Sequence, residues 1–286
     1  MRGWHGLTLA VLAIALGLLA LAFFQNYFIF HPARALDATP DLLRLPYEQI
    51  RLKTADGQIL GAWLVTADEP AATVLFLHGN AGNRSHRLNE VASLRREGLS
   101  VFIIDYRGYA ESTGRPSEQG LHLDARAAWD FLTRERGIAA EQIVLYGESL
   151  GSVPALELAR TLDREGQPGP AAIILEGAFT SALEVGRRAF PYLPVRLLLR
   201  AKLDNLTTIR DVAAPTLFLH GERDEVSPIE MGRRLFSTSP ARLKVFHEVP
   251  GAWHNTLWTS GGTGLYRVVR EFITRALADG AGPASG

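Results

Sequence analysis

The feature that most constrains this chain is a serine between two glycines, at the point where an apolar run leads into a helix-compatible segment. Residues 143–146 are β-prone, Gly147-Glu148-Ser149-Leu150-Gly151 follows, and residues 152–160 suit a helix. A strand that turns sharply into a helix strains the residue at the turn, and glycines on either side leave room for tight packing. The turn lifts the serine hydroxyl clear of the sheet, at the positive end of the next helix. Ser149 is therefore the candidate nucleophile.

A serine nucleophile needs a base, and the base needs an acid that orients it. Residues 215–219 form an apolar run leading into a loop with Asp224, and residues 243–249 form another leading into a loop with His254. In a parallel sheet the C-terminal ends of the strands converge on one edge, where ligands bind. We assign His254 as the base that takes the Ser149 proton and Asp224 as the acid that holds the imidazole.

Other carboxylates near the predicted site are alternatives to Asp224. Glu222 and Glu225 lie in the same loop, and Glu176 ends another predicted strand. The same loop also predicts the start of a helix, with Ser227 as its cap and Pro228 in its first position.

An oxyanion hole for such a serine consists of two backbone N–H groups. One belongs to the residue after the nucleophile, Leu150, and the other to a loop after an earlier strand. Residues 73–77 predict that strand, and its small-residue loop places the second donor at Asn80 or Ala81. Removing one such donor costs on the order of 3 kcal/mol of transition-state stabilisation, so we expect this loop to matter nearly as much as the triad.

Several motifs together resemble the α/β-hydrolase superfamily. They are His78-Gly79-Asn80-Ala81-Gly82-Asn83, Asp105-Tyr106-Arg107-Gly108-Tyr109, Gly147-Glu148-Ser149-Leu150-Gly151, the Asp224 loop and His254-Asn255. Within the superfamily they look most like the membrane-anchored group of alpha/beta hydrolase domain-containing protein 13 and its bacterial relatives. The resemblance runs from about Leu45 to Ala278 and implies Ser149, Asp224 and His254 as the triad. Related members of this group include protein depalmitoylases.

Composition argues against several other classes of protein. Thirty basic and thirty acidic residues cancel, so the chain lacks the basic excess of a nucleic-acid-binding domain. With no cysteine there is neither a disulfide framework nor a thiol nucleophile. None of the eight histidines falls in a metal-binding pair with acidic support, so we expect no metal and no cofactor.

The N-terminus predicts a membrane anchor over residues 1–31. Residues 7–24 are apolar or small apart from Thr8, and at about 1.5 Å per residue they would span about 27 Å, close to the hydrocarbon thickness of a bilayer. Arg2 precedes this run, which favours a cytoplasmic N-terminus and an extracytoplasmic hydrolase domain. A cleaved signal peptide is the alternative, since Ala20-Leu21-Ala22 resembles a cleavage site. We favour the uncleaved anchor because the apolar character continues beyond that site.

The rest of the chain predicts one domain. Residues 32–46 form a proline-containing linker, residues 47–278 the hydrolase domain, and residues 279–286 a disordered tail. A hairpin opens the domain, and strands then alternate with amphipathic helices. This alternation predicts an α/β fold with a mostly parallel central sheet and helices on both faces.

An irregular apolar segment interrupts the alternation at residues 177–211. We interpret it as a small cap, and we expect aromatic side chains to line an acyl pocket beneath it; the candidates are Tyr106, Phe179, Phe190 and Tyr192. Two alternatives stay open. The segment could lie on the membrane surface with Arg196 and Arg200 facing lipid headgroups, or it could be ordinary core packing.

These features predict a membrane-anchored serine hydrolase that cleaves carboxylic esters or thioesters through an acyl-enzyme. The expected partners are a small-molecule or lipid-derived acyl substrate and a membrane. A serine peptidase or amidase of the same fold is the alternative, disfavoured because an amine is a poorer leaving group. A binding protein without catalysis would predict a broken triad, and a haloalkane or epoxide enzyme would carry Asp at position 149.

Overall fold

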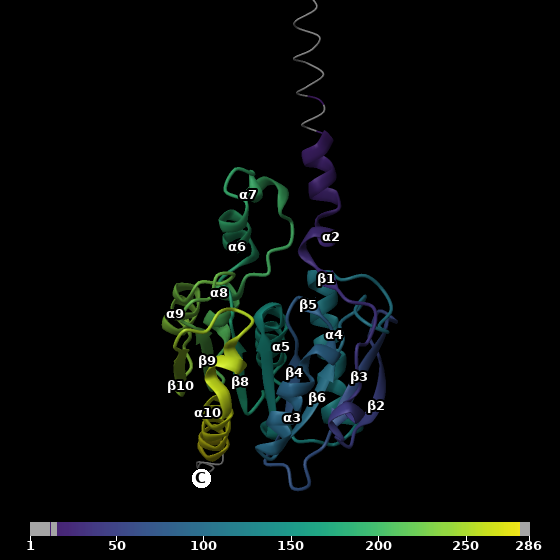
Figure 1. The fold of residues 1–286 in the computed structure, drawn as a ribbon, viewed down its shortest axis with the longest axis vertical. Coiled ribbons are helices and arrows are strands. Elements are labelled where there is room, and N and C mark those ends of the chain that lie inside the picture. The colour runs from purple at the N-terminus through teal and green to yellow at the C-terminus, as the bar shows by residue number, and fades with distance from the viewer. Residues whose placement is uncertain (1–11, 13–15, 281–286) are drawn as a thin grey trace, which may run out of the picture.

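The computed structural model describes residue 12 and residues 16–280, which build one large sheet with helices on both sides (Figure 1). The sheet has eight strands in the order β10-β9-β8-β7-β4-β6-β3-β2. Their bounds are β2 Glu48–Lys53, β3 Ile59–Val65, β4 Ala72–Leu77, β6 Leu99–Ile104, β7 Ile143–Glu148, β8 Ala172–Glu176, β9 Thr216–Gly221 and β10 Lys244–Val249.

The sheet is parallel from β10 to β6 and antiparallel at its other edge. β2 pairs antiparallel with β3, and β3 pairs antiparallel with β6, as expected for a hairpin that opens the domain. The remaining neighbours pair in parallel. β4, β6, β7 and β8 are nearly all buried, which explains their continuous apolar runs. The predicted mostly parallel α/β fold is confirmed.

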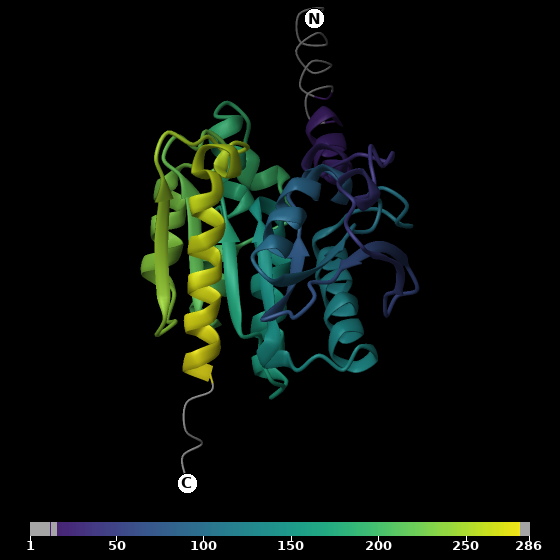
Figure 2. The same ribbon diagram turned by 60° about the horizontal axis from the view of Figure 1, so that its bottom comes forward.

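The helices divide into two layers, each with its own apolar core. α4 (Glu118–Asp130), α5 (Ser152–Arg164) and α9 (Ile229–Thr238) pack on one face of the sheet. α3 (Leu88–Arg96) and α10 (Leu257–Gly280) pack on the other face, and α10 is the long yellow helix at the front of Figure 2. This arrangement leaves the C-terminal ends of the parallel strands, and the loops that follow them, along one edge of the sheet.

Two helix boundaries differ from the sequence-based expectation. α9 begins at Ile229, its N-cap is Pro228, and no side chain caps it, so the prediction of Ser227 as its cap is wrong. α10 begins at Leu257, well before the predicted start near residue 265, and continues through a kink at Gly262 (φ 55°). A glycine cluster at residues 261–264 hides this helix in the sequence, because glycine disfavours a helix but tolerates the kink.

Residues 1–11 and 13–15 of the expected membrane anchor lie outside the described residues. In the part of the chain that the structure describes, no helix combines the length and the apolarity needed to cross a bilayer. The part of the expected tail beyond residue 280 is also outside the description. Near the N-terminus, the described residues include α2 (Gln25–Ile29), which leads into the two-residue strand β1 (His31–Pro32). β1 pairs with β5 (Ala81–Gly82). The end of the expected anchor and the start of the expected linker are therefore bound to the hydrolase domain.

The segment after β8 forms the cap region. α6 (Ala182–Ala189) and α7 (Val195–Leu198) project beyond the C-terminal edge of the sheet, beside α2 (Figure 1). α8 (Asn205–Thr208) returns the chain to the domain and contacts α5. The cap is thus a protruding helical hairpin, not a closed cover.

Candidate active site

Ser149 lies at the sharp turn between β7 and α5. Its φ is +48°, a left-handed conformation that costs a non-glycine residue about 1 kcal/mol or more. The flanking glycines are needed because the backbones nearly touch: a Cβ at Gly151 would lie 1.9 Å from the Leu77 carbonyl oxygen, and one at Gly147 would lie 2.7 Å from the Gly151 oxygen. The turn therefore holds Ser149 half-buried at the edge of the sheet, with α5 packed directly against the end of β4.

The structure brings Ser149, His254 and Asp224 together. His254 Nε2 lies 3.0 Å from Ser149 Oγ, and His254 Nδ1 lies 2.7 Å from Asp224 Oδ2. Ser149, His254 and Asp224 follow β7, β10 and β9, respectively. Ser149 and His254 are 105 positions apart in the chain. The distances are those of a nucleophile, a general base and an acid that orients the base.

The Asp224 loop is organised mostly by contacts within itself. Asp224 Oδ1 accepts hydrogen bonds from the Val226 and Ser227 amides at 3.0 and 2.8 Å, which leaves Oδ2 for the imidazole. Burial lowers the pKa of His254, but the hydrogen bond and the negative charge of Asp224 outweigh it, so the pKa lies above its usual value. Asp224 therefore stabilises the protonated form of the His254 imidazole, which is what a general base at this position requires.

Ser227 supports the triad in a way that the sequence did not indicate. Its hydroxyl donates to the Gly177 carbonyl oxygen at 2.7 Å and lies 3.2 Å from Asp224 Oδ2 and 3.3 Å from His254 Nδ1. Ser227 thus links the acid to the loop after β8. A serine before proline is typical of a helix start, so the local pattern pointed to capping.

The alternative acids have other partners. The Glu176 carboxylate lies 2.5 Å from the Tyr146 hydroxyl and accepts from Trp258 Nε1 at 3.0 Å. Burial and nearby acids raise the pKa of Glu176 to about 8. Glu222 accepts from the Gly251 amide, and Glu225 accepts from the His254 amide. Asp224 is thus the carboxylate that faces the imidazole.

The predicted oxyanion loop, residues 78–83, lies next to the Ser149 turn. β4 and β7 are neighbours, and Leu77 pairs with Gly147, so the loop after β4 lies beside the turn after β7. Leu150 is buried in the short 3-10 turn Ser149–Gly151 that precedes α5, and Asn80 is half-buried in the loop. The Asn80 side chain contacts the N-terminal segment, and the Tyr109 hydroxyl donates to Asn80 at 2.9–3.0 Å. Ala81 is exposed and lies in β5.

An ion pair joins this loop to the nucleophile strand. Glu148 accepts from the Gly79 amide at 3.1 Å and binds Arg87 through two hydrogen bonds of 2.5 and 2.7 Å. Burial raises the pKa of Glu148, but Arg87 lowers it more, so the carboxylate is ionised. Glu148 is thus a link between Ser149 and the loop of Asn80, which no local pattern predicted.

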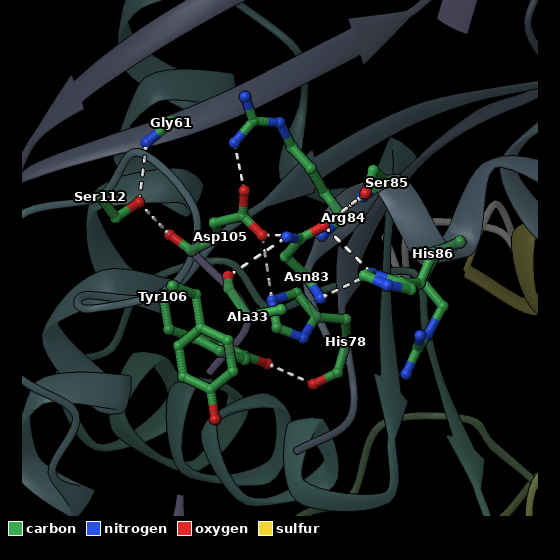
Figure 3. A network of polar contacts seen from close by, with 12 residues as sticks. Ala33, Gly61, His78, Asn83, Arg84, Ser85, His86, Asp105, Tyr106 and Ser112 are labelled. Carbon is green, nitrogen blue, oxygen red and sulfur yellow. Dashed lines mark hydrogen bonds and ion pairs between the residues drawn. The ribbon is translucent and has the colours of Figure 1, made fainter. Parts of the chain in front are cut away.

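A buried polar network lies behind the loop (Figure 3). Asp105 forms an ion pair with Arg84, accepts from the Arg84 amide at 2.7 Å, and lies 3.4 Å from His78 Nε2. The Tyr106 hydroxyl donates to the His78 carbonyl oxygen at 3.0 Å. Figure 3 shows Asp105 between Arg84 and His78, the residue at the base of the loop.

The four aromatic residues expected to contact substrate are not gathered in one place. Tyr106 is fully buried in the network around His78, and Phe179 is buried in the core beneath the cap. Phe190 and Tyr192 are 59% and 97% exposed on the protruding hairpin. The apolar segment that looked like a pocket lining thus divides between core and surface. Among the described residues, no group of three or more His, Asp or Glu side chains is arranged to hold a metal ion.

The comparisons with known proteins agree with this geometry. The family described as Hydrolase_4, serine aminopeptidase S33, matches residues 68–208 and 195–259, a span that includes the loops of Asn80, Ser149, Asp224 and His254. The chain belongs to this family of α/β-hydrolases. The resemblance inferred from the motifs is confirmed.

Relatives cover nearly the whole chain. Protein bem46 of Schizosaccharomyces pombe is 35% identical over 93% of this chain and 90% of its own length. Alpha/beta hydrolase domain-containing protein WAV2 of Arabidopsis thaliana is 30% identical over 92% and 91%. A membrane protein of Saccharomyces cerevisiae, YNL320W, is 36% identical over 82% of each chain.

Solved structures share the fold. The esterase Pf2001 of Pyrococcus furiosus superimposes with a TM-score of 0.72 over 86% of this chain and 99% of its own, at 21% identity. The chain is therefore a hydrolase of the α/β-hydrolase fold, with three side chains in the arrangement of a serine hydrolase triad.

Proposed function

We propose that this protein is a serine hydrolase that cleaves carboxylic esters or thioesters through an acyl-enzyme. The observation that carries the proposal is the unbroken series of contacts from Ser149 Oγ through His254 to Asp224, at a serine held with φ +48°. Strained backbone persists where the surrounding structure holds it and often serves function. A serine used only for binding has no need of this conformation or of an oriented imidazole.

The reaction follows from the geometry. Ser149 Oγ attacks the acyl carbon while its proton passes to His254 Nε2, and the carbonyl π electrons move to the oxygen. The Asn80 or Ala81 amide and the Leu150 amide donate to that oxyanion. His254 then gives the proton to the departing alkoxide or thiolate. Water, deprotonated by the same nitrogen, attacks the acyl group, and Ser149 Oγ leaves with the proton as the free acid departs.

Esters and thioesters fit better than amides. Their leaving groups depart with little help, whereas an amine needs complete proton transfer from the imidazolium. The family description includes the word aminopeptidase, so peptide bonds are the alternative substrate class.

A fluorophosphonate probe tests this proposal directly. Native wild type should be labelled, while Ser149→Ala and heat-denatured protein should not. A separate sample of enzyme that has not been exposed to the probe is assayed with p-nitrophenyl esters and acyl thioesters of increasing chain length and with aminoacyl anilides. Turnover of esters or thioesters at least 100-fold faster than anilides is expected. Folded but unlabelled wild type, or preferred anilide hydrolysis, would contradict the proposal.

We also propose that the protein is membrane-anchored, with the tip of the cap at the bilayer surface. Large apolar side chains are exposed along the N-terminal segment, from Leu16 (69%) to Phe28 (62%), and on the hairpin, where Leu197 is 82% exposed. Both project from the same end of the molecule (Figure 1). Arg187, Arg188, Arg196 and Arg200 lie in or next to the hairpin and suit anionic headgroups.

The absence of cysteine makes this second proposal easy to test. Tyr192→Cys and Leu42→Cys each provide one site for an environment-sensitive dye; Leu42 is 71% exposed in the turn Pro40–Leu43, outside the hairpin. In full-length protein reconstituted into anionic vesicles, the dye at 192 should report an apolar environment and the dye at 42 should not. Release of the protein by alkaline carbonate would contradict anchoring. Protease protection in intact cells tests the expected extracytoplasmic side.

A further inference from the structure

We propose that residues 25–35, which we call the N-terminal strap, are part of the catalytic site because they position the oxyanion loop through the Asn80 side chain. This inference rests on the proposed function. It gives the end of the expected anchor and the start of the expected linker a role in the chemistry as well as in attachment. The strap contacts two regions, the oxyanion loop and the end of the cap, and we call each contact a crossing.

Asn80 is the centre of the first crossing. Its Nδ2 donates to the Ile29 carbonyl oxygen at 2.6 Å, and its Oδ1 accepts from the His31 amide at 3.1 Å. The Tyr109 hydroxyl donates toward the same Oδ1 and the Asn80 carbonyl oxygen, at 3.0 and 2.9 Å. An amide side chain that both donates to and accepts from one strand imitates a backbone pairing. The side chain therefore fixes the orientation of its own peptide unit.

The next residues extend this attachment along the loop. β1 pairs with β5, and the Ala33 amide donates to the Gly82 carbonyl oxygen at 3.1 Å. Asn83 Nδ2 then donates to the carbonyl oxygens of Ala33 and Ala35 at 3.2 and 2.5 Å. Residues 80–83 are thus bound to a segment about 50 positions earlier in the chain.

The strap reaches the cap at its other end. Gln25 Oε1 accepts from the amides of Arg200 and Ala201, at 2.8 and 3.1 Å, at the point where the hairpin returns to the domain. Phe30, which lies between Ile29 and His31, is only 2% exposed and belongs to the same apolar core as α4 and α5. One short segment therefore holds both the loop that stabilises the oxyanion and the base of the cap.

The two ends predict different kinetic effects. The amide of Asn80 acts in the transition state, so loosening it should lower kcat with little change in KM. Gln25 acts on the cap, which contacts the acyl chain in both ground and transition states. Loosening it should change KM and chain-length preference with little change in kcat.

The test uses full-length protein and four variants. Asn80→Asp keeps the acceptor but replaces the donor to Ile29 with a second oxygen; it should lower kcat at least tenfold at unchanged KM. It should also weaken binding of a boronic acid, which forms a tetrahedral adduct on the serine, by a similar factor. Tyr109→Phe should also lower kcat and weaken boronic-acid binding, but to a smaller extent. It provides the test if Asn80→Asp fails to fold. Gln25→Ala should change KM more than kcat.

Asp37→Asn is the matched control. Asp37 lies just beyond the strap, and its carboxylate forms an exposed pair with His86 at 3.1 Å, so its loss should leave both constants unchanged. If wild type is active and boronic-acid-sensitive but Asn80→Asp and Tyr109→Phe keep wild-type kcat and inhibitor affinity, the strap proposal is wrong. A wild type that is neither labelled nor active would instead contradict the proposed function.

Discussion

The same four residues occur where two strands of this protein end, and the loops that follow are held in different ways. Phe76-Leu77-His78-Gly79 spans the end of β4 and leads into the loop of Asn80, while Phe218-Leu219-His220-Gly221 ends β9 and leads into the loop of Asp224. In both, the histidine is buried and lies near an aspartate: His78 is 3.4 Å from Asp105, and His220 is 3.5 Å from Asp224.

The difference lies in what holds each loop. The Asp224 loop is closed by its own amides, and His220 Nε2 contacts the Ser227 carbonyl oxygen at 2.6 Å, all within seven residues. The Asn80 loop depends on Ile29 and His31 from the N-terminal strap and on Glu148 from β7. The Asp224 loop also has contacts with Gly177, Val249 and Ala252, but its acid is held by amides of its own loop, whereas the Asn80 side chain is held by distant parts of the chain.

The largest effect should come from the acid loop. Asp224→Asn keeps the size of the side chain but removes the charge that stabilises the imidazolium and selects its tautomer. We expect kcat to fall by about 10³- to 10⁴-fold with little change in Tm. The measurement is steady-state hydrolysis of an activated ester. Glu176→Gln is the control, and a comparable loss in that variant would assign the acid role to β8 instead.

The dependence of kcat/KM on pH should also reflect the influence of Asp224 on His254. The base works as neutral imidazole, and the pKa of His254 is raised, so kcat/KM should be highest above that pKa and fall about tenfold for each pH unit below it. The midpoint should lie above 6.5, the usual value for histidine. In Asp224→Asn the midpoint should move to lower pH. A midpoint that stays in place would show that Asp224 does not set this pKa.

A smaller effect on kcat is expected for Glu148, the residue that links the nucleophile strand to the oxyanion loop. Glu148→Gln keeps an acceptor for the Gly79 amide but removes the charge that Arg87 pairs with. We expect about a tenfold drop in kcat at similar KM, because the loop loosens without losing its donors. The matched variant on the other side is Glu225→Gln, an exposed residue that only accepts from the His254 amide and should change kcat by less than twofold. Equal losses would mean that the two loops are held alike.

Alanine substitutions at Gly79 and Gly221 should lower the stability of the protein by different amounts. A Cβ at Gly221 would lie 2.5 Å from the Ala252 carbonyl oxygen, which is backbone, whereas one at Gly79 would meet Glu148 Oε1 at 2.8 Å, the end of a side chain that can move. Gly221→Ala should lower the free energy of unfolding by about 1–3 kcal/mol. Gly79→Ala should cost less stability and mainly reduce kcat. Denaturant unfolding with parallel ester assays measures both, and the opposite order would contradict this comparison.

Part of the site followed from local patterns. The sequence placed Ser149, Asp224 and His254 at strand ends, and parallel topology alone predicts that such ends converge. Other expectations depended on where a segment folds. Apolar character at Phe190 and Tyr192 suggested a pocket, but the hairpin points them outward, and Ser227 contacts the triad instead of capping α9.

The sequence by itself determined the fold class and predicted the nucleophile turn with its candidate base and acid, because each depends on local patterns at strand ends and on the order of the strands. Only the tertiary structure decided what holds the oxyanion loop and where the cap lies. The contacts between Asn80 and Ile29, Glu148 and Arg87, and Gln25 and Arg200 join residues 51, 61 and 175 positions apart. A hydrogen bond between such distant residues leaves no periodicity in the chain, since it depends on how the elements between them pack.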